Sequence, residues 1–292
     1  MSWLVCAVHE NVAVNPPGGQ QVDEQTVSIG GQQIAFLQSE GDGRAVVFVH
    51  GNSSSARTWL PVLTGAFGHR FRCVAPDLPG HGQSAPAPDH SAYSLPGHAA
   101  VLAAFTTATG TAGAVIVGWS LGGHVALEAA PAMPAAAGYV IFGAPPVSPA
   151  APAGNAFLPN PVRNVVFTAA VSPEDARAFA ASCTAPGSAL SLDELTADIL
   201  RTDGAARAGL FASLREGRFA DEVAIAAALQ RPLAILHGQD EQMVNLGYLQ
   251  QLAIPSLWRG GVQLIAGAGH APHQEMPGKF TELLTQFITD LG

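Results

Sequence analysis

The sequence is poor in charged residues and contains no long apolar run. Only 12% of its 292 residues are Asp, Glu, Lys or Arg, and the net charge is −9. An acidic chain without a Lys or Arg cluster disfavours nucleic acid and anionic membrane surfaces as partners. No apolar stretch reaches the ~20 residues that span a bilayer, and no basic residue precedes the short apolar run 4–8 as in a secretory signal. We therefore expect a cytoplasmic protein without nucleic-acid or membrane partners.

Cysteine is also scarce, and metal-binding patterns are lacking. Cys6, Cys73 and Cys183 lie far apart and form neither a CxxC pattern nor a disulfide framework, so we expect reduced thiols. The histidines considered as metal ligands are isolated in the sequence: His81, His98, His124 and His270. No GxGxxG or GxxxxGK[ST] phosphate loop occurs. We expect no metal and no cofactor.

Short apolar runs recur along the rest of the chain. Hydrophobic residues make up 48% of the sequence, enough for a sizeable core. The runs are 26–29, 34–38, 45–49, 72–75, 114–117, 139–142, 233–236 and 262–266. Stretches of helical length separate most of them: 56–66, 94–109, 121–131, 245–253 and 277–290. This alternation predicts an α/β fold with a mostly parallel, eight-stranded sheet flanked by helices.

Two segments depart from this rhythm. Residues 1–25 contain turn formers and little periodicity, and we interpret them as an N-terminal extension, either an arm or a partly disordered segment. Residues 146–225 are too long for a structureless loop and carry helix-like patterns. We expect them to form a helical cap over the carboxyl ends of the strands, where such sheets bind ligands. The core then comprises 26–145 and 226–292.

A Gly-x-Ser-x-Gly sequence, Gly118 to Gly122, follows one apolar run and precedes a helical stretch. In this strand–turn–helix context the central residue, Ser120, is a nucleophile on a tight, strained turn that side chains at either glycine would crowd. The turn also places Ser120 at a helix N-terminus, where free N–H groups favour a developing anion. We predict that Ser120 is the nucleophile and that the Leu121 N–H is an oxyanion donor.

A second loop, His50-Gly51-Asn52-Ser53-Ser54-Ser55, follows the run 45–49. The loop at this position supplies the other oxyanion N–H in such folds, so we assign it to Asn52, whose side-chain amide is also able to face the substrate. We expect His50 to brace the loop rather than to bind a metal.

The base and the acid are expected in two loops near the C-terminus. His270 lies in a Gly-flanked loop after the last strand, which favours it as base over the nearby His273. The segment after 233–236 carries Asp240 and Glu241, and neighbours on an extended segment point in opposite directions. We favour Glu241, in the register of a G-x-x-D-x-x-V pattern, with Asp240 as the other candidate. The order Ser, acid, His matches this type of triad.

The motifs together resemble the α/β-hydrolase superfamily, and within it the metal-independent, quorum-quenching AidH-type N-acyl-homoserine lactonases. The resemblance rests on H-G-N-S-S-S (50–55), P-D-L-P-G-H-G (76–82), G-W-S-L-G-G-H (118–124), G-A-P-P-V (143–147), R-T-D-G-A-A-R (201–207), G-Q-D-E (238–241), S-L-W-R-G (256–260) and A-G-H-A-P (268–272). It implies the α/β-hydrolase fold and the triad described above. It further implies that Gly51, Trp119 and Phe179 lie beside the substrate. Where the cap of this family offers a tyrosine hydroxyl to the substrate amide, this sequence has Phe179, which implies weaker amide recognition or another donor.

The expected function is opening of an N-acyl-homoserine lactone by nucleophilic catalysis, with direct attack by water as a variant. A general carboxylesterase or small-ester hydrolase with the same triad is the first alternative. A non-catalytic small-molecule binding protein on a hydrolase scaffold is the second. The partner in every case is a small molecule, and the sequence leaves the oligomeric state open.

Overall fold

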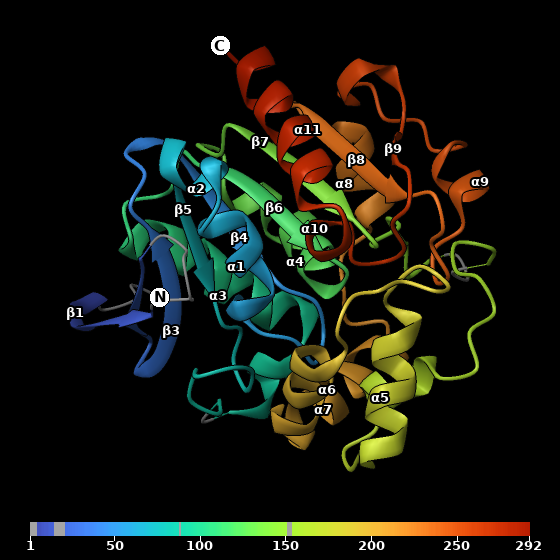
Figure 1. Cartoon of the computed structure of the whole chain (residues 1–292), viewed down its shortest axis with the longest axis horizontal. Helices are drawn as coiled ribbons and strands as arrows, with labels where there is room; N and C mark the ends of the chain where they lie inside the picture. Colours follow the sequence, from blue (N-terminus) through green and yellow to red (C-terminus); the bar gives the residue numbers. More distant parts are fainter. Residues whose placement is uncertain (1–4, 15–20, 88, 151–153) are drawn as a thin grey trace.

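The computed structural model describes residues 5–14, 21–87, 89–150 and 154–292 (Figure 1). Within them, nine strands form one sheet in the order β1-β2-β3-β5-β4-β6-β7-β8-β9. The strands are β1 (Val5–Val14), β2 (Val22–Ile29), β3 (Gln32–Ser39), β4 (Gly43–Val49), β5 (Phe71–Pro76), β6 (Val115–Trp119), β7 (Gly138–Phe142), β8 (Leu233–Gly238) and β9 (Gln263–Ile265).

The helices lie between the strands and in the insertion that follows β7. The α-helices are α1 (Leu60–Leu63), α2 (Ala66–Arg70), α3 (Leu95–Ala108), α4 (Leu121–Ala129), α5 (Pro173–Ser182), α6 (Asp193–Arg201), α7 (Gly204–Arg215), α8 (Glu222–Ala228), α9 (Leu246–Leu249), α10 (Pro272–Glu275) and α11 (Pro277–Asp290). The 3-10 helices are η1 (Ala56–Trp59), η2 (His90–Tyr93), η3 (Ala130–Ala132), η4 (Arg163–Phe167) and η5 (Trp258–Gly260).

The eight predicted strands are β2 to β9. Strands β4 to β9 pair in parallel, whereas β2 and β3 form an antiparallel hairpin that joins the sheet along β5. This confirms the predicted fold class. The central parallel strands β6, β7 and β8 are buried on both faces, which explains why these segments read as continuous apolar runs rather than as alternating ones.

The ninth strand, β1, differs from the expectation for residues 1–25. Val5 to Val14 pair antiparallel with β2 and cover the edge of the β2–β3 hairpin, and β2 already begins at Val22. Two register shifts interrupt this pairing, so the segment lacks the regular alternation by which the sequence would have indicated a strand. The rest of the predicted arm that precedes Val5 or spans 15–20 lies outside the described residues.

Helices cover both faces of the sheet, and each face has its own apolar core (Figure 1). Trp59, Phe280 and Phe287 fill the side covered by α1, α2 and α11. The opposite side, under α3, α4 and α8, is filled by residues such as Leu102 and Val125. The site loops therefore extend from strands fixed on both sides.

The insertion between β7 and β8 is helical. Figure 1 shows α5, α6 and α7 grouped together at one end of the molecule, beyond the carboxyl ends of the parallel strands. The boundary expected at residue 225 falls inside α8, which packs against α4 of the core. In the structure, the insertion is better described as ending before Glu222, where α8 begins.

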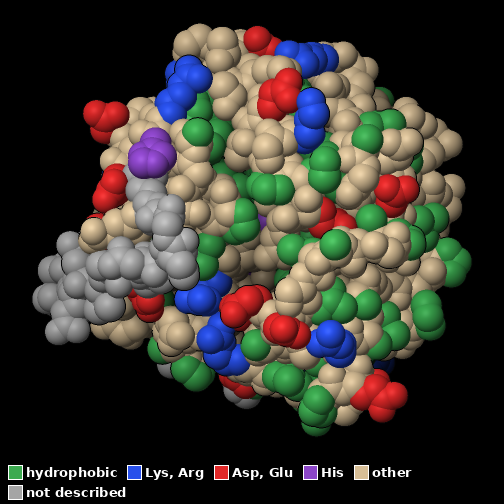
Figure 2. All heavy atoms as spheres, in the orientation of Figure 1, with side chains coloured by type: hydrophobic (Ala, Val, Ile, Leu, Met, Phe, Trp, Pro, Cys, Tyr) green, Lys and Arg blue, Asp and Glu red, His purple; other side chains and the backbone are tan. Residues whose placement is uncertain are grey.

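The surface has no dominant charged patch on the face seen in Figure 2, where acidic and basic side chains are scattered. None of the helices in the described ranges combines the length and the apolar character needed to cross a bilayer.

Candidate active site

Ser120 occupies the sharp turn between β6 and α4. Its backbone has φ 52° and ψ −118°, a strained conformation for a residue with a side chain, and its N–H donates to Phe142 O at 2.8 Å. The flanking glycines are required sterically. A Cβ at Gly122 would lie 2.1 Å from Val49 O, and one at Gly118 would lie 2.3 Å from Gly122 O. The turn thus brings α4 directly against the end of β4.

His270 and Glu241 form a buried pair. His270 Nδ1 lies 2.8 Å from Glu241 Oε2, and Met243 N–H donates to Glu241 Oε1 at 2.8 Å. Burial acts to raise the pKa of Glu241, but the facing His270 and the hydrogen bonds hold it below its ordinary value. Asp240, the other candidate, is exposed. The structure therefore brings Glu241 rather than Asp240 to the histidine.

Three further residues fix the His270 loop. Trp119 Nε1 donates to His270 O at 2.7 Å, and Gly269 N–H donates to Glu275 Oε2 at 2.7 Å. The imidazole packs on Gly143, where φ is +62° and an added Cβ would lie 2.5 Å from His270 Cε1. These contacts hold the ring beside the turn that carries the serine.

Ser120 and His270 line one cavity of about 760 Å³. Within the described chain, the Ser120 hydroxyl makes no hydrogen bond, and the His270 ring bonds only to Glu241. Because Nδ1 is engaged, Nε2 is the ring nitrogen left to accept a proton from the hydroxyl. Such contacts are often loose in ligand-free enzymes and tighten when substrate binds.

The two predicted oxyanion donors, Asn52 and Leu121, line the same cavity. Neither backbone N–H donates to any residue that the structure describes. The Asn52 side chain departs from the expectation that its amide faces the substrate, because Nδ2 donates to Val166 O in the insertion at 2.8 Å. Gly51 packs closely here, since a Cβ on it would lie 3.1 Å from Trp119 Cε3 and 3.3 Å from Ser120 Cβ.

The neighbouring histidines serve as supports. His50 Nδ1–H donates to Gly51 O at 2.7 Å, and Leu78 N–H donates to Nε2 at 2.9 Å, so the ring is neutral and braces the loop as expected. Burial lowers its pKa well below the ordinary value. His273 is fully buried among aromatic rings, with Nε2 2.8 Å from Thr58 Oγ1. His273 is therefore a core residue and not a candidate for the base.

Most of the remaining cavity wall is apolar and comes from the insertion. Trp119 and Phe179, both expected beside the substrate, line it and are almost fully buried. The other aromatic residues of the wall are Phe157, Phe167, Phe211 and Phe219. An apolar wall above a polar floor suits an acyl group with an ester at one end.

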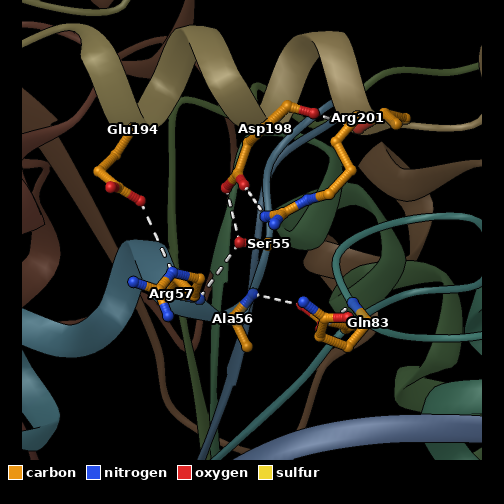
Figure 3. Close-up of polar contacts among 9 residues, drawn as sticks. Ser55, Ala56, Arg57, Gln83, Glu194, Asp198 and Arg201 are labelled. Carbon is orange, nitrogen blue, oxygen red and sulfur yellow. Dashed lines mark hydrogen bonds and ion pairs between the residues drawn. The ribbon is translucent and has the colours of Figure 1, made fainter. Parts of the chain in front are cut away.

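The loop 50–55 is tied to α6 through Ser55 (Figure 3). Ser55 Oγ donates to Asp198 Oδ2 at 2.6 Å, and Arg201 Nη2 donates to the other carboxylate oxygen of Asp198. One residue further, Ala56 N–H donates to Asp77 Oδ1 at 2.6 Å. The acidic groups on α6 and after β5 thus fix the loop that carries Asn52.

The R-T-D-G-A-A-R segment extends this connection. Asp203 N–H donates to Gly80 O at 2.9 Å, and Tyr93 O–H donates to Asp203 Oδ2 at 2.8 Å. Arg207 donates to three backbone carbonyls, including Ile199 O at 3.0 Å. This motif joins the insertion to the core rather than lining the cavity.

Sequence reasoning missed one polar pair at the cavity wall. His124, which the sequence presents as isolated, lies with Nδ1 2.9 Å from Glu222 Oε2. The two residues are far apart in sequence, and no local pattern links them. Gly143 and Glu275 were also missed; a glycine directly after a parallel strand was the available signal for the first. No cluster of three or more metal-ligating side chains is found in the described part of the chain.

Comparison with known proteins places this geometry in a class. The sequence profile of the alpha/beta hydrolase family matches residues 46–283, and the chain belongs to that family. Pimeloyl-[acyl-carrier protein] methyl ester esterases are 29% identical in Xanthomonas oryzae pv. oryzae and 32% identical in Xanthomonas campestris pv. campestris; each match covers 86% of this chain and 97% of the relative.

Solved structures add a second group of relatives. A variant of the N-acyl homoserine lactonase AidH complexed with N-hexanoyl homoserine has a TM-score of 0.88 and 34% identity, covering 92% of this chain and 97% of that one. AidH complexed with N-butanoyl homoserine has a TM-score of 0.84 and 33% identity, covering 97% of both chains. Esterases and lactonases among its relatives support an ester hydrolase.

Proposed function

We propose that this protein opens the lactone ring of N-acyl homoserine lactones, using Ser120 as nucleophile, His270 as base and Glu241 as acid. The observation that supports this most is the likeness, at 34% identity over nearly the whole chain, to an AidH variant complexed with N-hexanoyl homoserine. The apolar cavity over Ser120 fits an acyl chain with its lactone at the floor.

In the proposed first half-reaction, the lactone carbonyl lies against the N–H groups of Asn52 and Leu121. Ser120 Oγ attacks the carbonyl carbon while His270 Nε2 takes its proton, and the oxyanion accepts the two N–H bonds. Collapse breaks the ring C–O bond. His270 returns the proton to the departing alkoxide, which remains attached as the homoserine hydroxyl.

In the second half-reaction, water attacks the acyl-enzyme. His270 removes a proton from the water, the new C–O bond forms, and the Ser120–acyl bond breaks with return of the proton to Oγ. The product is an N-acyl homoserine. Glu241 keeps Nδ1–H of His270 in place in both halves and stabilises the imidazolium. In this proposal, the helical insertion that ends before Glu222 acts as a cap that excludes water around the acyl chain.

A second candidate is hydrolysis of an open-chain ester, favoured by the methyl ester esterases that match 86% of this chain. The same triad and cavity serve both reactions. The two candidate reactions differ in whether the leaving alkoxide of the substrate is part of a ring.

The deciding experiment compares kcat/KM for N-acyl homoserine lactones of several chain lengths with p-nitrophenyl and methyl esters, with and without a chelator. Lactone preference that survives chelation supports the proposal, and a marked preference for open esters contradicts it. Ser120→Ala is expected to abolish turnover while retaining ligand binding. Persistent turnover in this variant would remove Ser120 from its assigned role.

A further inference from the structure

A second histidine–carboxylate pair lies on the cavity wall, one helical turn beyond Ser120. His124 N–H donates to Ser120 O at 3.3 Å, so the two residues stand in an i, i+4 relation at the start of α4. Ser120 itself is non-helical, with φ 52° and ψ −118°, and four residues along α4 correspond to a rise of about 6 Å. His124 lines the cavity that contains Ser120.

Glu222 holds this histidine from behind. Its carboxylate is 0% exposed and lies 2.9 and 3.0 Å from His124 Nδ1, and Val147 N–H donates to Oε2 at 3.0 Å. A buried carboxylate is costly unless it is paired, so Nδ1 carries the proton and faces Glu222. The pair fixes the ring orientation in the same way as Glu241 fixes His270.

The opposite edge of the ring remains available. The His124 side chain is 14% exposed, and Nε2 has no hydrogen-bond partner within the described ranges. Burial acts to lower the pKa of His124, but Glu222, with a contribution from Glu128, outweighs it and raises the pKa above its ordinary value. This favours the imidazolium, in which Nε2–H is a donor.

The other charged groups of the wall are placed differently. Arg163 and Arg215 are exposed and lie over the rings of Phe157 and Phe211, and His270 is engaged with Glu241. His124 is therefore a half-buried donor near the nucleophile that the triad does not use. Its natural partner is an oxygen acceptor close to the scissile carbonyl.

We propose that His124, positioned by Glu222, binds a second carbonyl oxygen of the substrate, that of the amide in the N-acyl group. This inference rests on the proposed function. In an N-acyl homoserine lactone, the amide carbonyl carbon is three bonds from the ring carbonyl carbon, which suits a donor one helical turn from Ser120. A simple ester or alkyl lactone offers no oxygen there, so His124 selects acylated amino-acid derivatives.

The test measures a ratio of kcat/KM values in wild type and His124→Leu. One pair of substrates is N-hexanoyl homoserine lactone and an alkyl-substituted γ-butyrolactone of matched length. The other is N-hexanoylglycine methyl ester and methyl nonanoate. In each pair, the amide-bearing to amide-free ratio is expected to fall about 10- to 100-fold in the variant, as for loss of a charge-assisted hydrogen bond. Phe211→Leu, which alters the cavity wall without removing a donor, is the matched control and should leave the ratio within about twofold.

An unchanged ratio in His124→Leu overturns the inference, even where kcat/KM falls equally for both members of a pair. The open-chain pair tests the inference independently of the proposed function. If the protein hydrolyses esters but not lactones, the proposed lactonase activity is contradicted. The ratio of kcat/KM for the two open-chain esters in His124→Leu and wild type still tests the role of His124. Binding of N-hexanoyl homoserine lactone in the Ser120→Ala background gives a readout without turnover. There, His124→Leu is expected to raise Kd by a similar factor, and an unchanged Kd contradicts the proposal.

Because His124→Leu leaves a buried carboxylate without its partner, Glu222→Gln provides a second variant. Its amide oxygen can still accept from Val147 N–H and from His124 Nδ1–H, but the charge is gone. The His124 pKa, followed by NMR, should fall, and the substrate ratio should fall with it. A lower pKa with an unchanged ratio argues against the proposal.

Discussion

Nδ1 of His270 lies 2.8 Å from Oε2 of Glu241, with both side chains at most 3% exposed. Because both side chains are buried, water cannot take the place of either hydrogen-bonding partner. Glu241 is also held by Met243 N–H, which donates to Oε1 at 2.8 Å and leaves Oε2 to the imidazole. Nε2 of His270 is thereby left unpaired among the described residues, in a ring that lines the same cavity as Ser120.

Replacing Glu241 by Gln is expected to lower kcat by about 10³- to 10⁴-fold, because the amide neither enforces the required tautomer nor stabilises the imidazolium. Steady-state kinetics on any cleaved ester or lactone measure this. Asp240→Asn, a change at the exposed neighbour, is the control and should stay within about twofold. A loss below tenfold in the Glu241 variant would mean that another group orients His270.

The turn at Ser120 makes a steric prediction. Gly122→Ala would put a Cβ 2.1 Å from Val49 O, and backbone cannot yield as a side chain does. We expect a loss of at least about 2 kcal/mol in the free energy of unfolding, together with loss of activity. Gly278→Ala in α11 has open space around its Cβ and should be neutral or stabilising by up to about 1 kcal/mol. Equal urea midpoints for the two variants would contradict this account.

The link between Ser55 and Asp198 predicts coupling between the insertion and the loop that carries Asn52. Asp198→Asn replaces charge-assisted hydrogen bonds from Ser55 and Arg201, so we expect a loss of about 1–3 kcal/mol in the free energy of unfolding and a lower kcat/KM.

The matched control for this prediction is Glu194→Gln on the same helix. Glu194 pairs with Arg57 at 3.6 Å, and both side chains are exposed (Figure 3). Such a surface pair contributes at most about 1 kcal/mol. Chemical denaturation of both variants, combined with kinetics, tests the coupling. It is absent if Asp198→Asn unfolds like the control and retains full kcat/KM.

Local patterns in the sequence were sufficient to predict the parallel strands and the turn at Ser120. Continuous apolar runs identify strands buried on both faces, and two obligatory glycines identify the turn, because both signals lie within a few residues. The strand β1 was missed because its pairing with β2 shifts register twice and leaves no regular alternation.

Interactions across the fold were not predictable in this way. His124 meets Glu222 only because α8 packs on α4, and Ser55 meets Asp198 only because α6 lies over the loop after β4. Glu222 and Asp198 lie in none of the local sequence motifs. The direction of the Asn52 amide was likewise decided by Val166, a residue of the insertion.

The last prediction concerns acid stability and a histidine buried outside the site. His98 is 0% exposed, and neither ring nitrogen has a hydrogen-bond partner among the described residues. Burial, followed by the nearby His81, lowers its pKa to about 3, whereas an unfolded histidine titrates near 6.5. Between these values the unfolded chain binds the extra proton. Stability from this group is thus complete above pH 6.5 and is lost as the pH falls towards 3.

His98→Leu removes this titration and two unpaired polar atoms. The difference in the free energy of unfolding, variant minus wild type, should be small at pH 7.5 and should grow in favour of the variant to on the order of 3 kcal/mol at pH 4. Comparing the two proteins cancels the titration of groups on which His98 does not act, including Asp77, whose pKa burial raises to about 7 and which acts in the opposite sense. Urea unfolding at pH 7.5, 6, 5 and 4 measures the difference, and a pH-independent value would show that His98 accepts its proton in the folded state as readily as in the unfolded chain.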